Sequence, residues 1–393
     1  MNYRKAKLSD IGKIVSGATP KTKDPDNYDG DIAWITPADL SKYNKKYISH
    51  GARSITQKGY DSCSTQLMPK GTVLFSSRAP IGYVAIAENA LCTNQGFKSI
   101  IPGNDIDSEF LYYQLKYLKK EIQEKGSGTT FKEISAKTLG EVFVTVPPLD
   151  EQSRIVACIE ELFSELDKAV DTLKTTKEQL EVYRQAVLKD AFSDFEKKDS
   201  IRNLTMVVTS GSRGWAKYYS DSGALFVRIG NLTHNGIDID FRDIQHITPP
   251  DNAEGVRTRL QPNDVLVSIT ADLGSIGFVS EKVEEAYINQ HIALVRFQNP
   301  VQGRFMAWYL RSEYGQKDLL KNKRGGGKLG LGLDDIRDTP VPIVDDITAK
   351  EIVDKVEEQL SVCDSIEKTV DIALAQADAM RQSILKQAFE EKI

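Results

Sequence analysis

The stretch that decides the fold reads LDEQSRIVACIEELFSELDKAVDTLKTTKEQLEVYRQAVLKDAF and covers residues 149–192. It contains neither Pro nor Gly, and its apolar residues recur in alternating steps of four and three between Ile155 and Val187. This spacing is typical of a coiled-coil helix with one apolar stripe. A helix over residues 150–192 would be about 64 Å long. Because a helix of that length with a single apolar stripe is unstable alone in water, it needs a partner.

A second segment near the end of the chain, between Ile352 and Ile384, has the same spacing and also lacks Pro and Gly. We therefore expect two long helices that pack against each other as an antiparallel coiled coil. The residues predicted to pair the helices are Ile155, Ile159, Leu162, Leu166, Leu173 and Leu180 in the first segment and Ile352, Val356, Ile366, Val370, Met380 and Ile384 in the second.

Both segments belong to an internal repeat that spans the chain. Leu74 maps to Leu266 at an offset of 192, whereas Asp167 maps to Asp364 at an offset of 197. The offset changes only before the helical segments, as expected if loops tolerate insertions and packed helices do not. The repeat predicts two mixed α/β (α+β) lobes, each followed by a long helix. The predicted bounds are 1–148 for lobe one, 149–199 for its helix, 200–343 for lobe two and 344–393 for its helix.

The charge of the chain is distributed along the same boundaries. The whole chain carries a net charge of −5, but these four segments carry +5, −5, +1 and −6 in order. Phosphate contacts, if the chain binds nucleic acid, should therefore come from the lobes. The acidic helices suit a protein partner or solvent better than DNA.

Several classes of protein are disfavoured by what the sequence lacks. No apolar run reaches the roughly 18–20 residues of a membrane span. The four cysteines are scattered, which fits neither a zinc site nor a disulfide framework and suits a cytoplasmic protein. We find no polar-Pro-Pro-aromatic motif for base methylation, and Gly325-Gly326-Gly327-Lys328 lacks the spacing of a nucleotide-binding loop. No metal site and no catalytic residue are predicted.

In the order of its short motifs the chain resembles the specificity subunits of type I restriction-modification systems. The motifs are Ser16-Gly17-Ala18-Thr19-Pro20, Trp34-Ile35-Thr36, Gly71-Thr72-Val73-Leu74-Phe75-Ser76 and Val146-Pro147-Pro148-Leu149-Asp150-Glu151-Gln152. The resemblance implies that each lobe is a target recognition domain that reads one half of an asymmetric, interrupted site in double-stranded DNA. It implies that the helices set the spacing and dock two methyltransferase subunits, which two restriction subunits complete. S-adenosylmethionine, ATP and magnesium would belong to those partners, so the chain itself would hold no cofactor and would not be an enzyme.

The candidate DNA contacts lie in loops that combine glycine, hydroxyl and basic residues. Glycine exposes backbone N–H groups to phosphate, and Lys and Arg neutralise it. Three arginines, Arg78, Arg213 and Arg228, are candidates for bidentate contact with guanine. The full set is Thr19, Lys21, Lys23, Arg78, Ser127, Thr129, Thr130 and Lys132 in lobe one, and Arg213, Arg228, Lys323, Arg324 and Lys328 in lobe two.

Other interpretations of these features stay open at this stage. Any one loop could be an ordinary solvated turn, and the repeated pairs Asn94-Gln95 and Asn289-Gln290 could satisfy backbone groups instead of reading bases. Two other classes of function are a coiled-coil adaptor without a DNA role and a fused restriction-methylation enzyme. The second half also departs from the first, with Arg213-Gly214 in place of Thr19-Pro20 and Thr348-Ala349 in place of Glu151-Gln152.

Overall fold

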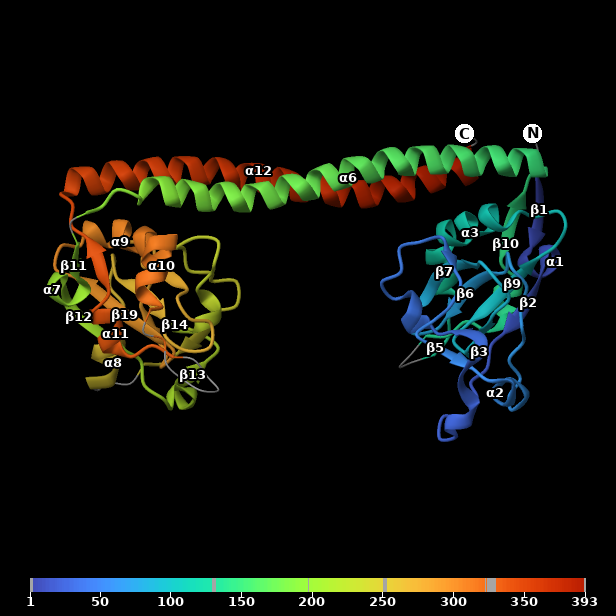
Figure 1. The fold of residues 1–393 in the computed structure, drawn as a ribbon, viewed down its shortest axis with the longest axis horizontal. Helices are drawn as coiled ribbons and strands as arrows, with labels where there is room; N and C mark the ends of the chain where they lie inside the picture. The colour runs from blue at the N-terminus through green and yellow to red at the C-terminus, as the bar shows by residue number, and fades with distance from the viewer. Residues whose placement is uncertain are drawn as a thin grey trace. The chain divides into compact units, whose positions relative to one another are not determined.

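The computed structural model describes residues 3–128, 132–196, 198–249, 253–321, 323 and 330–391. The chain divides into two compact units. Unit 1 comprises Met1–Leu173 and Ile372–Ile393, and unit 2 comprises Lys174–Asp371. Each unit therefore contains one mixed lobe and one part of each long helix (Figure 1).

Lobe one of unit 1 is built on two sheets and a strand pair. One sheet has the order β2-β9-β6-β7-β4 and a second has the order β5-β3-β8, while β1 pairs with β10. The strands are β1 (Arg4–Lys7), β2 (Gly12–Ser16), β3 (Tyr28–Ile35), β4 (Tyr47–Ile48), β5 (Arg53–Ile55), β6 (Val73–Ser77), β7 (Ile81–Ala87), β8 (Cys92–Thr93), β9 (Lys98–Pro102) and β10 (Phe143–Val146).

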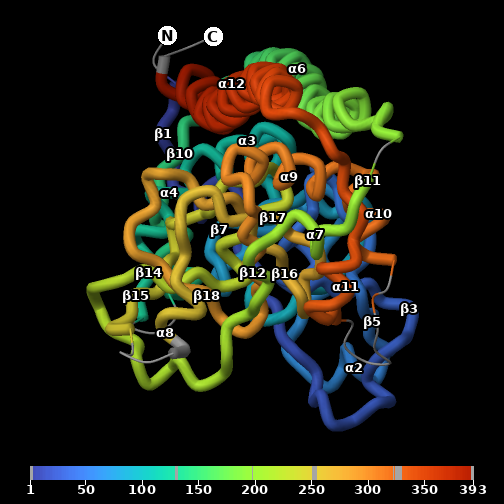
Figure 2. Tube along the Cα trace, turned by 90° about the vertical axis from the view of Figure 1, so that its left-hand side faces the viewer, coloured from blue at the N-terminus to red at the C-terminus, as the bar shows by residue number. Residues whose placement is uncertain are grey.

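Short helices connect these strands. They are α1 (Leu8–Ile11), α2 (Gln57–Asp61), α3 (Ser108–Tyr117), α4 (Lys119–Glu124) and α5 (Ala136–Gly140). The start of α3 follows from its N-cap, because the Asp107 side chain accepts hydrogen bonds from the backbone N–H groups of Glu109 and Phe110 at 2.9 Å each. Within unit 1, α3 lies between the sheet and the long helices (Figures 1 and 2).

Lobe two of unit 2 repeats this plan. One sheet has the order β12-β19-β16-β17, a second has the order β13-β15-β14-β18, and β11 pairs with β20. The strands are β11 (Lys198–Ser200), β12 (Thr205–Ser210), β13 (Tyr219–Ser220), β14 (Ala224–Val227), β15 (Gln245–Ile247), β16 (Val265–Ser268), β17 (Ile276–Phe278), β18 (Ala286–Ile288), β19 (Ile292–Phe297) and β20 (Pro340–Pro342). The helices are α7 (Ile201–Leu204), α8 (Ala253–Thr258), α9 (Gln302–Arg311), α10 (Glu313–Leu319) and α11 (Leu333–Arg337).

The two long helices are α6 (Leu149–Ala191) and α12 (Asp346–Lys386). Pro147-Pro148 ends β10 and places the start of α6 directly after it, because Pro is unfavourable inside a helix and acceptable before one. Ion pairs join the helices within each unit and show that they run antiparallel. In unit 2, Arg184 lies 2.6 Å from Asp364 and Lys177 lies 2.8 Å from Asp371, and in unit 1 Arg381 pairs with Asp167.

Each lobe packs its core against both long helices. In unit 1, Ile155 and Ile159 of α6 and Leu385 of α12 join a buried cluster that contains Phe75 and Phe110. In unit 2, Val187 of α6 and Val356 of α12 join the corresponding cluster around Phe305. The predicted fold class, two mixed lobes in a repeat with two long antiparallel helices, is confirmed.

The stripe by which the helices face each other differs from the predicted one in part. Of the predicted pairing residues, Ile155, Ile159, Val356, Val370 and Ile384 are buried, while Leu162, Leu166, Leu173, Leu180 and Ile352 are half-buried. Ile366 is 40% exposed and Met380 is 54% exposed, so the prediction that they pair the helices is wrong. The neighbouring residues Glu367 and Arg381 face α6 instead, because each forms an ion pair with a residue of that helix.

A subset of the buried and half-buried positions follows one unbroken pattern of four and three steps, which we call the helix seam. The helix seam consists of Gln152, Val156, Ile159, Phe163, Leu166, Val170, Leu173, Lys177, Leu180, Arg184, Val187 and Ala191 in α6, and of Ala349, Val353, Val356, Leu360, Cys363, Glu367, Val370, Leu374, Ala377, Arg381, Ile384 and Ala388 in the second half. Every member of the first set maps to a member of the second at an offset of 197.

Candidate nucleic-acid interface

The loops that carry the predicted lobe-one contacts meet at one edge of the β2-β9-β6-β7-β4 sheet. Strand β2 ends at Ser16 opposite the start of β9 at Lys98, and Ser76 of β6 pairs with Phe97. The loops that follow Ser16, precede Lys98 and join β6 to β7 therefore lie together. The segment around Glu133 is added by backbone bridges from Glu133 to Arg78 and to Ser127. We call this edge the lobe-one loop edge.

Arg78 is the central cation of the lobe-one loop edge. Its guanidinium lies 3.5 Å from the Glu133 carboxylate, which also lies 3.9 Å from the Lys98 ammonium. Burial lowers the pKa of Lys98, although Glu133 opposes this shift and Arg78 adds to it. Arg78 and Glu133 line a hollow of about 710 Å³ together with Thr36, Tyr83 and Asn94. One cation and one carboxylate, Arg78 and Glu133, thus face a space that is open to an anionic or hydrogen-bonding ligand.

The turn before β9 is held by its own side chains. The Oδ1 atom of Asn94 accepts a hydrogen bond from the Gly96 backbone N–H at 2.8 Å, and the Thr19 hydroxyl donates to the Gln95 side chain. A Cβ atom at Gly17 would lie 2.0 Å from the Asn94 carbonyl oxygen, so this position needs glycine. Asn94 therefore has a structural role, whereas the neighbouring Gln95 is exposed and is added to the candidate contacts.

The remaining predicted contacts of lobe one are spread around this edge. Lys21, Lys23, Ser127 and Lys132 are all exposed. Lys132 lines a second hollow beside the β6–β7 loop, together with Pro80 and Lys120. The predicted contacts Thr129 and Thr130 lie outside the described residues.

Lobe two has a corresponding edge, formed by the loops after β12, between β16 and β17, and before β19. His291 Nδ1 lies 2.5 Å from the Thr270 hydroxyl, and Arg257 donates to the Thr209 hydroxyl at 2.6 Å and to the Ser212 hydroxyl at 2.7 Å. We call this edge the lobe-two loop edge. Thr270, His291 and Arg257 were not among the predicted contacts. The repeat could have indicated the first two, because Arg78 maps to Thr270 and Gly96 maps to His291.

The predicted lobe-two contacts differ in their surroundings. Arg213 is exposed, whereas Arg228 is half-buried and lies 3.6 Å from Asp243. The Nε atom of Arg228 is buried without a hydrogen-bond partner among the described residues, so this guanidinium keeps an unused donor. Lys323 is exposed. Arg324 and Lys328 lie outside the described residues.

One cluster in lobe two contains the residue types of a hydrolytic triad. Asp272 Oδ2 lies 2.7 Å from His234 Nε2, and the Ser275 hydroxyl lies 3.3 Å from the same nitrogen. In a triad the carboxylate and the hydroxyl must bind opposite ring nitrogens, so that the imidazole can accept the hydroxyl proton. Here both compete for Nε2, and the arrangement is not that of a nucleophile and base. Among the described residues, no group of three or more His, Cys, Asp or Glu is placed to hold a metal ion.

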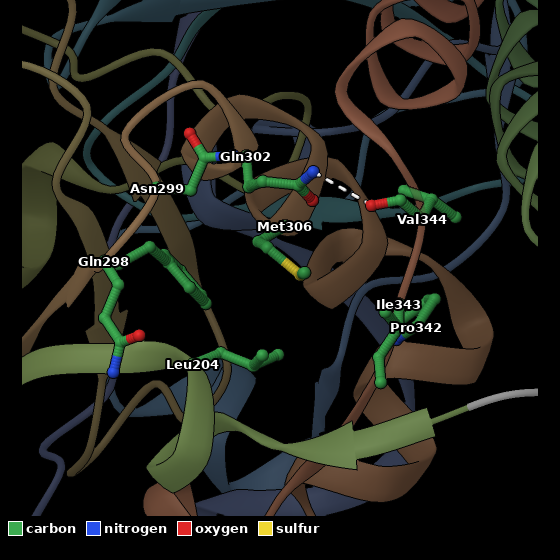
Figure 3. Close-up of a pocket in the computed structure, with 9 residues that line it drawn as sticks. Leu204, Gln298, Asn299, Gln302, Met306, Pro342, Ile343 and Val344 are labelled. Atoms are coloured by element: carbon green, nitrogen blue, oxygen red, sulfur yellow. Dashed lines mark hydrogen bonds between the residues drawn. The ribbon is translucent and has the colours of Figure 1, made fainter.

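A separate apolar hollow in lobe two is lined in part by Pro342, Ile343 and Val344, where β20 leads into α12 (Figure 3). Its volume is about 200 Å³, and Leu204, Phe297, Met306 and Ile343 contribute to its lining. The side chain of Gln302 crosses this region and donates to the Val344 carbonyl at 3.0 Å (Figure 3). We therefore regard this hollow as part of the junction between β20 and α12.

Within the part of the chain that the structure describes, none of the helices combines the length and the apolar character that a membrane crossing requires.

Comparison with known proteins gives matches to the specificity subunits of type I restriction enzymes. Residues 2–182 match the model of the type I restriction modification DNA specificity domain. The chain is 44% identical over 192 residues to the MjaIX specificity subunit of Methanocaldococcus jannaschii, which covers 48% of this chain and 44% of that protein. It is 25% identical over 425 residues to the EcoBI specificity subunit of Escherichia coli, which covers 100% of this chain and 86% of that protein.

Solved structures show the same fold over the whole chain. A chain from a type I restriction-modification assembly has a TM-score of 0.78 at 16% identity, with coverage of 100% of this chain and 98% of its own. The HsdS subunit of Thermoanaerobacter tengcongensis has a TM-score of 0.60 at 17% identity, with coverage of 100% and 97%. Residues 2–182 therefore carry a type I restriction modification DNA specificity domain, and the whole chain is similar to specificity subunits of type I restriction enzymes.

Proposed function

We propose that this chain recognises a two-part sequence in double-stranded DNA and that each loop edge reads one part. The observation that carries the proposal is the repetition of the loop edge, with Arg78 beside Glu133 in lobe one and with Arg228 and Arg257 near the corresponding edge in lobe two. Hydrogen bonds to base edges would supply specificity, and exposed Lys21, Lys23 and Lys132 would supply phosphate contacts. Because the two edges carry different side chains, the two half-sites should differ in sequence.

An exchange of lobes tests this proposal. Residues 1–148 are replaced by the corresponding lobe of another family member, and the chain is expressed with its methyltransferase partner. Sequencing of methylated sites should show one half-site changed and the other retained. Changes in both halves would contradict independent reading. As a matched control, the exchange of residues 200–343 should alter only the other half.

The second part of the proposal concerns partners. The long helices are acidic, and we propose that they dock two methyltransferase subunits, to which two restriction subunits are added. S-adenosylmethionine, ATP and Mg²⁺ would be used by those subunits, and this chain would recognise DNA without catalysis. Incubation of the purified chain with labelled S-adenosylmethionine, or with ATP and Mg²⁺, should then yield neither methylation nor cleavage. Activity that persists through further purification would overturn this part.

A coiled-coil adaptor without a DNA role is the second candidate that the long helices allow. The two functions are distinguished by a DNA mobility shift at several salt concentrations. A recognition subunit should lose affinity steeply as salt rises. An adaptor should show no binding at any of them.

A further inference from the structure

The charged residues in the helix seam and directly beside it fall into two classes. The first class repeats. Asp167 and Arg184 of the first half map at the offset of 197 to Asp364 and Arg381 of the second half. Arg184 pairs with Asp364 in unit 2, and Arg381 pairs with Asp167 in unit 1. Because the same pair occurs in both units, any two copies of either helix could form it. These pairs define the register of antiparallel helices without selecting a partner.

The second class does not repeat. In unit 2, Lys177 lies 3.4 Å from Glu367 and 2.8 Å from Asp371. All three positions change in the other copy of the repeat, where Lys177 corresponds to Leu374, Glu367 to Val170 and Asp371 to Lys174. One layer of the seam is therefore an ion pair in unit 2, while the matching positions Val170 and Leu374 in unit 1 are apolar and half-buried.

This asymmetry has a consequence for partner choice. If α6 paired with a second α6 in the register that the repeated pairs define, each Lys177 would meet Val170 where Glu367 now lies and Lys174 where Asp371 now lies. The ammonium would lose both carboxylates and gain a like charge. If α12 paired with a second α12, Leu374 would meet Glu367 and Asp371. Only the pairing of α6 with α12 puts an ion pair in one layer and two apolar residues in the other.

We propose that the layer formed by Lys177, Glu367 and Asp371 makes each long helix select the other half of the chain over a second copy of itself. Polar residues in a coiled-coil seam select partners in this way, because mismatched partners leave them without a counter-charge. The proposal does not depend on DNA recognition.

The test uses the whole folded chain, cut after folding at a protease site inserted after Glu196. Light and isotopically heavy preparations are cut and mixed, and native mass spectrometry counts pairs of unlike halves and of like halves. A pair that contains one light and one heavy half shows that halves have separated and paired again. The temperature of the mixture is raised until such pairs appear in the spectrum. The ratio of unlike to like pairs should exceed its statistical value by about tenfold or more.

The decisive variant combines Lys177→Leu, Glu367→Val and Asp371→Lys, which makes this layer the same in both halves. Like pairs should then rise to near their statistical proportion. A control with Lys350→Gln and Asp354→Asn removes an exposed ion pair of α12 that lies outside the seam and should behave as the unaltered chain. Statistical pairing of the unaltered halves, or a variant that pairs as they do, would overturn the proposal.

A measurement on the uncut chain covers the case in which the cut halves unfold before they exchange. Lys177→Leu and Glu367→Val should each lower Tm more than both together, because only the double change recreates the apolar layer seen at Val170 and Leu374. Losses that simply add would overturn the proposal, because the two residues would then not be coupled.

Discussion

The repeat aligns the loop edges of lobe one and lobe two position by position. Asn94 and Asn289 occupy the same turn, and each accepts a hydrogen bond from the backbone N–H two residues ahead, at 2.8 Å from Gly96 and at 3.0 Å from His291. Ala79 and Ala271 occupy the same position of the loop between two strands, and both have positive φ values, of 53° and 60°. The backbone of the edge is thus shaped in the same way in both lobes.

The side chains that project from this shared backbone differ. Arg78 corresponds to Thr270, Thr36 to Arg228 and Gly96 to His291. Positions that keep their residue hold the loop, and positions that change lie beside the hollow or project from the turn. The comparison teaches that candidate base contacts are best sought where the lobes share a backbone and differ in chemistry.

The junctions between strand and long helix differ in a second way. In unit 1, Gln152 is fully buried, accepts a hydrogen bond from the Asp107 N–H at 2.8 Å and donates to the carbonyls of Asp105 at 2.9 Å and Pro147 at 2.8 Å. Unit 2 has Ala349 at this position, and Gln302 of α9 instead donates to the Val344 carbonyl and to Asp346. The junction is bound by a side chain of the long helix in unit 1 and by a side chain of α9 in unit 2, which explains why the second half can depart from Glu151-Gln152.

The largest effect is expected from Gln152→Ala. The change leaves the Asp107 N–H and the carbonyls of Asp105 and Pro147 without their partner, and the bond to Pro147 is buried. It should lower the free energy of unfolding of lobe one by about 2–4 kcal/mol. The matched change Gln302→Ala should cost lobe two only about 1 kcal/mol, because Gln302 is partly exposed. Hydrogen exchange of peptides from each lobe measures both. Equal losses would remove the distinction between the junctions.

The next effect concerns Arg78→Ala in lobe one. If Arg78 leaves Glu133 to bind a guanine, the variant should lose about 1–3 kcal/mol of discrimination at one base pair of one half-site. Thr270→Ala at the matching position of lobe two should affect the other half-site and by less. Binding to sets of single-base site variants gives both values. Arg154→Ala, on α6, serves as the control and should leave every preference unchanged, whereas uniform weakening by Arg78→Ala would assign Arg78 to phosphate.

A smaller effect is expected from Asn94→Ala and Asn289→Ala. Each removes one turn hydrogen bond and should lower stability by about 1 kcal/mol. Sequence preference should stay the same, because these side chains face the backbone. Asn→Asp at either position keeps the acceptor oxygen and should restore most of the loss in thermal unfolding. A change in the bases preferred would show that the shared residues also read DNA.

The smallest effect is expected when Lys21 and Lys23 are both changed to Ala. Affinity should fall by a similar factor for all sequences, and the slope of log affinity against log salt should flatten by about one unit per lost phosphate contact. Arg213→Ala, in the corresponding loop after β12, provides the matched change in lobe two. An unaltered slope would place the loop after β2 outside the interface.

Much of the architecture is determined by the sequence alone. The heptad spacing of residues 149–192 and its recurrence at an offset of 197 establish two long helices and two lobes. The spacing of apolar residues is a local property of the sequence, so it indicates a helix without knowledge of what that helix packs against. The order of the loops around Thr19, Arg78 and Lys132 was also predictable, since glycine and basic residues mark them.

The identity of the buried stripe was decided only by tertiary structure. Steps of three and four lead from Leu180 through Tyr183 to Val187, yet Tyr183 is 49% exposed. Arg184 is only 6% exposed instead, because Asp364 and Glu367 of the other helix supply its counter-charges. Likewise, nothing local relates Arg78 to Glu133, or Gln152 to Asp107. Those contacts join residues that are distant in sequence, and only the pairing of strands and helices brings them together.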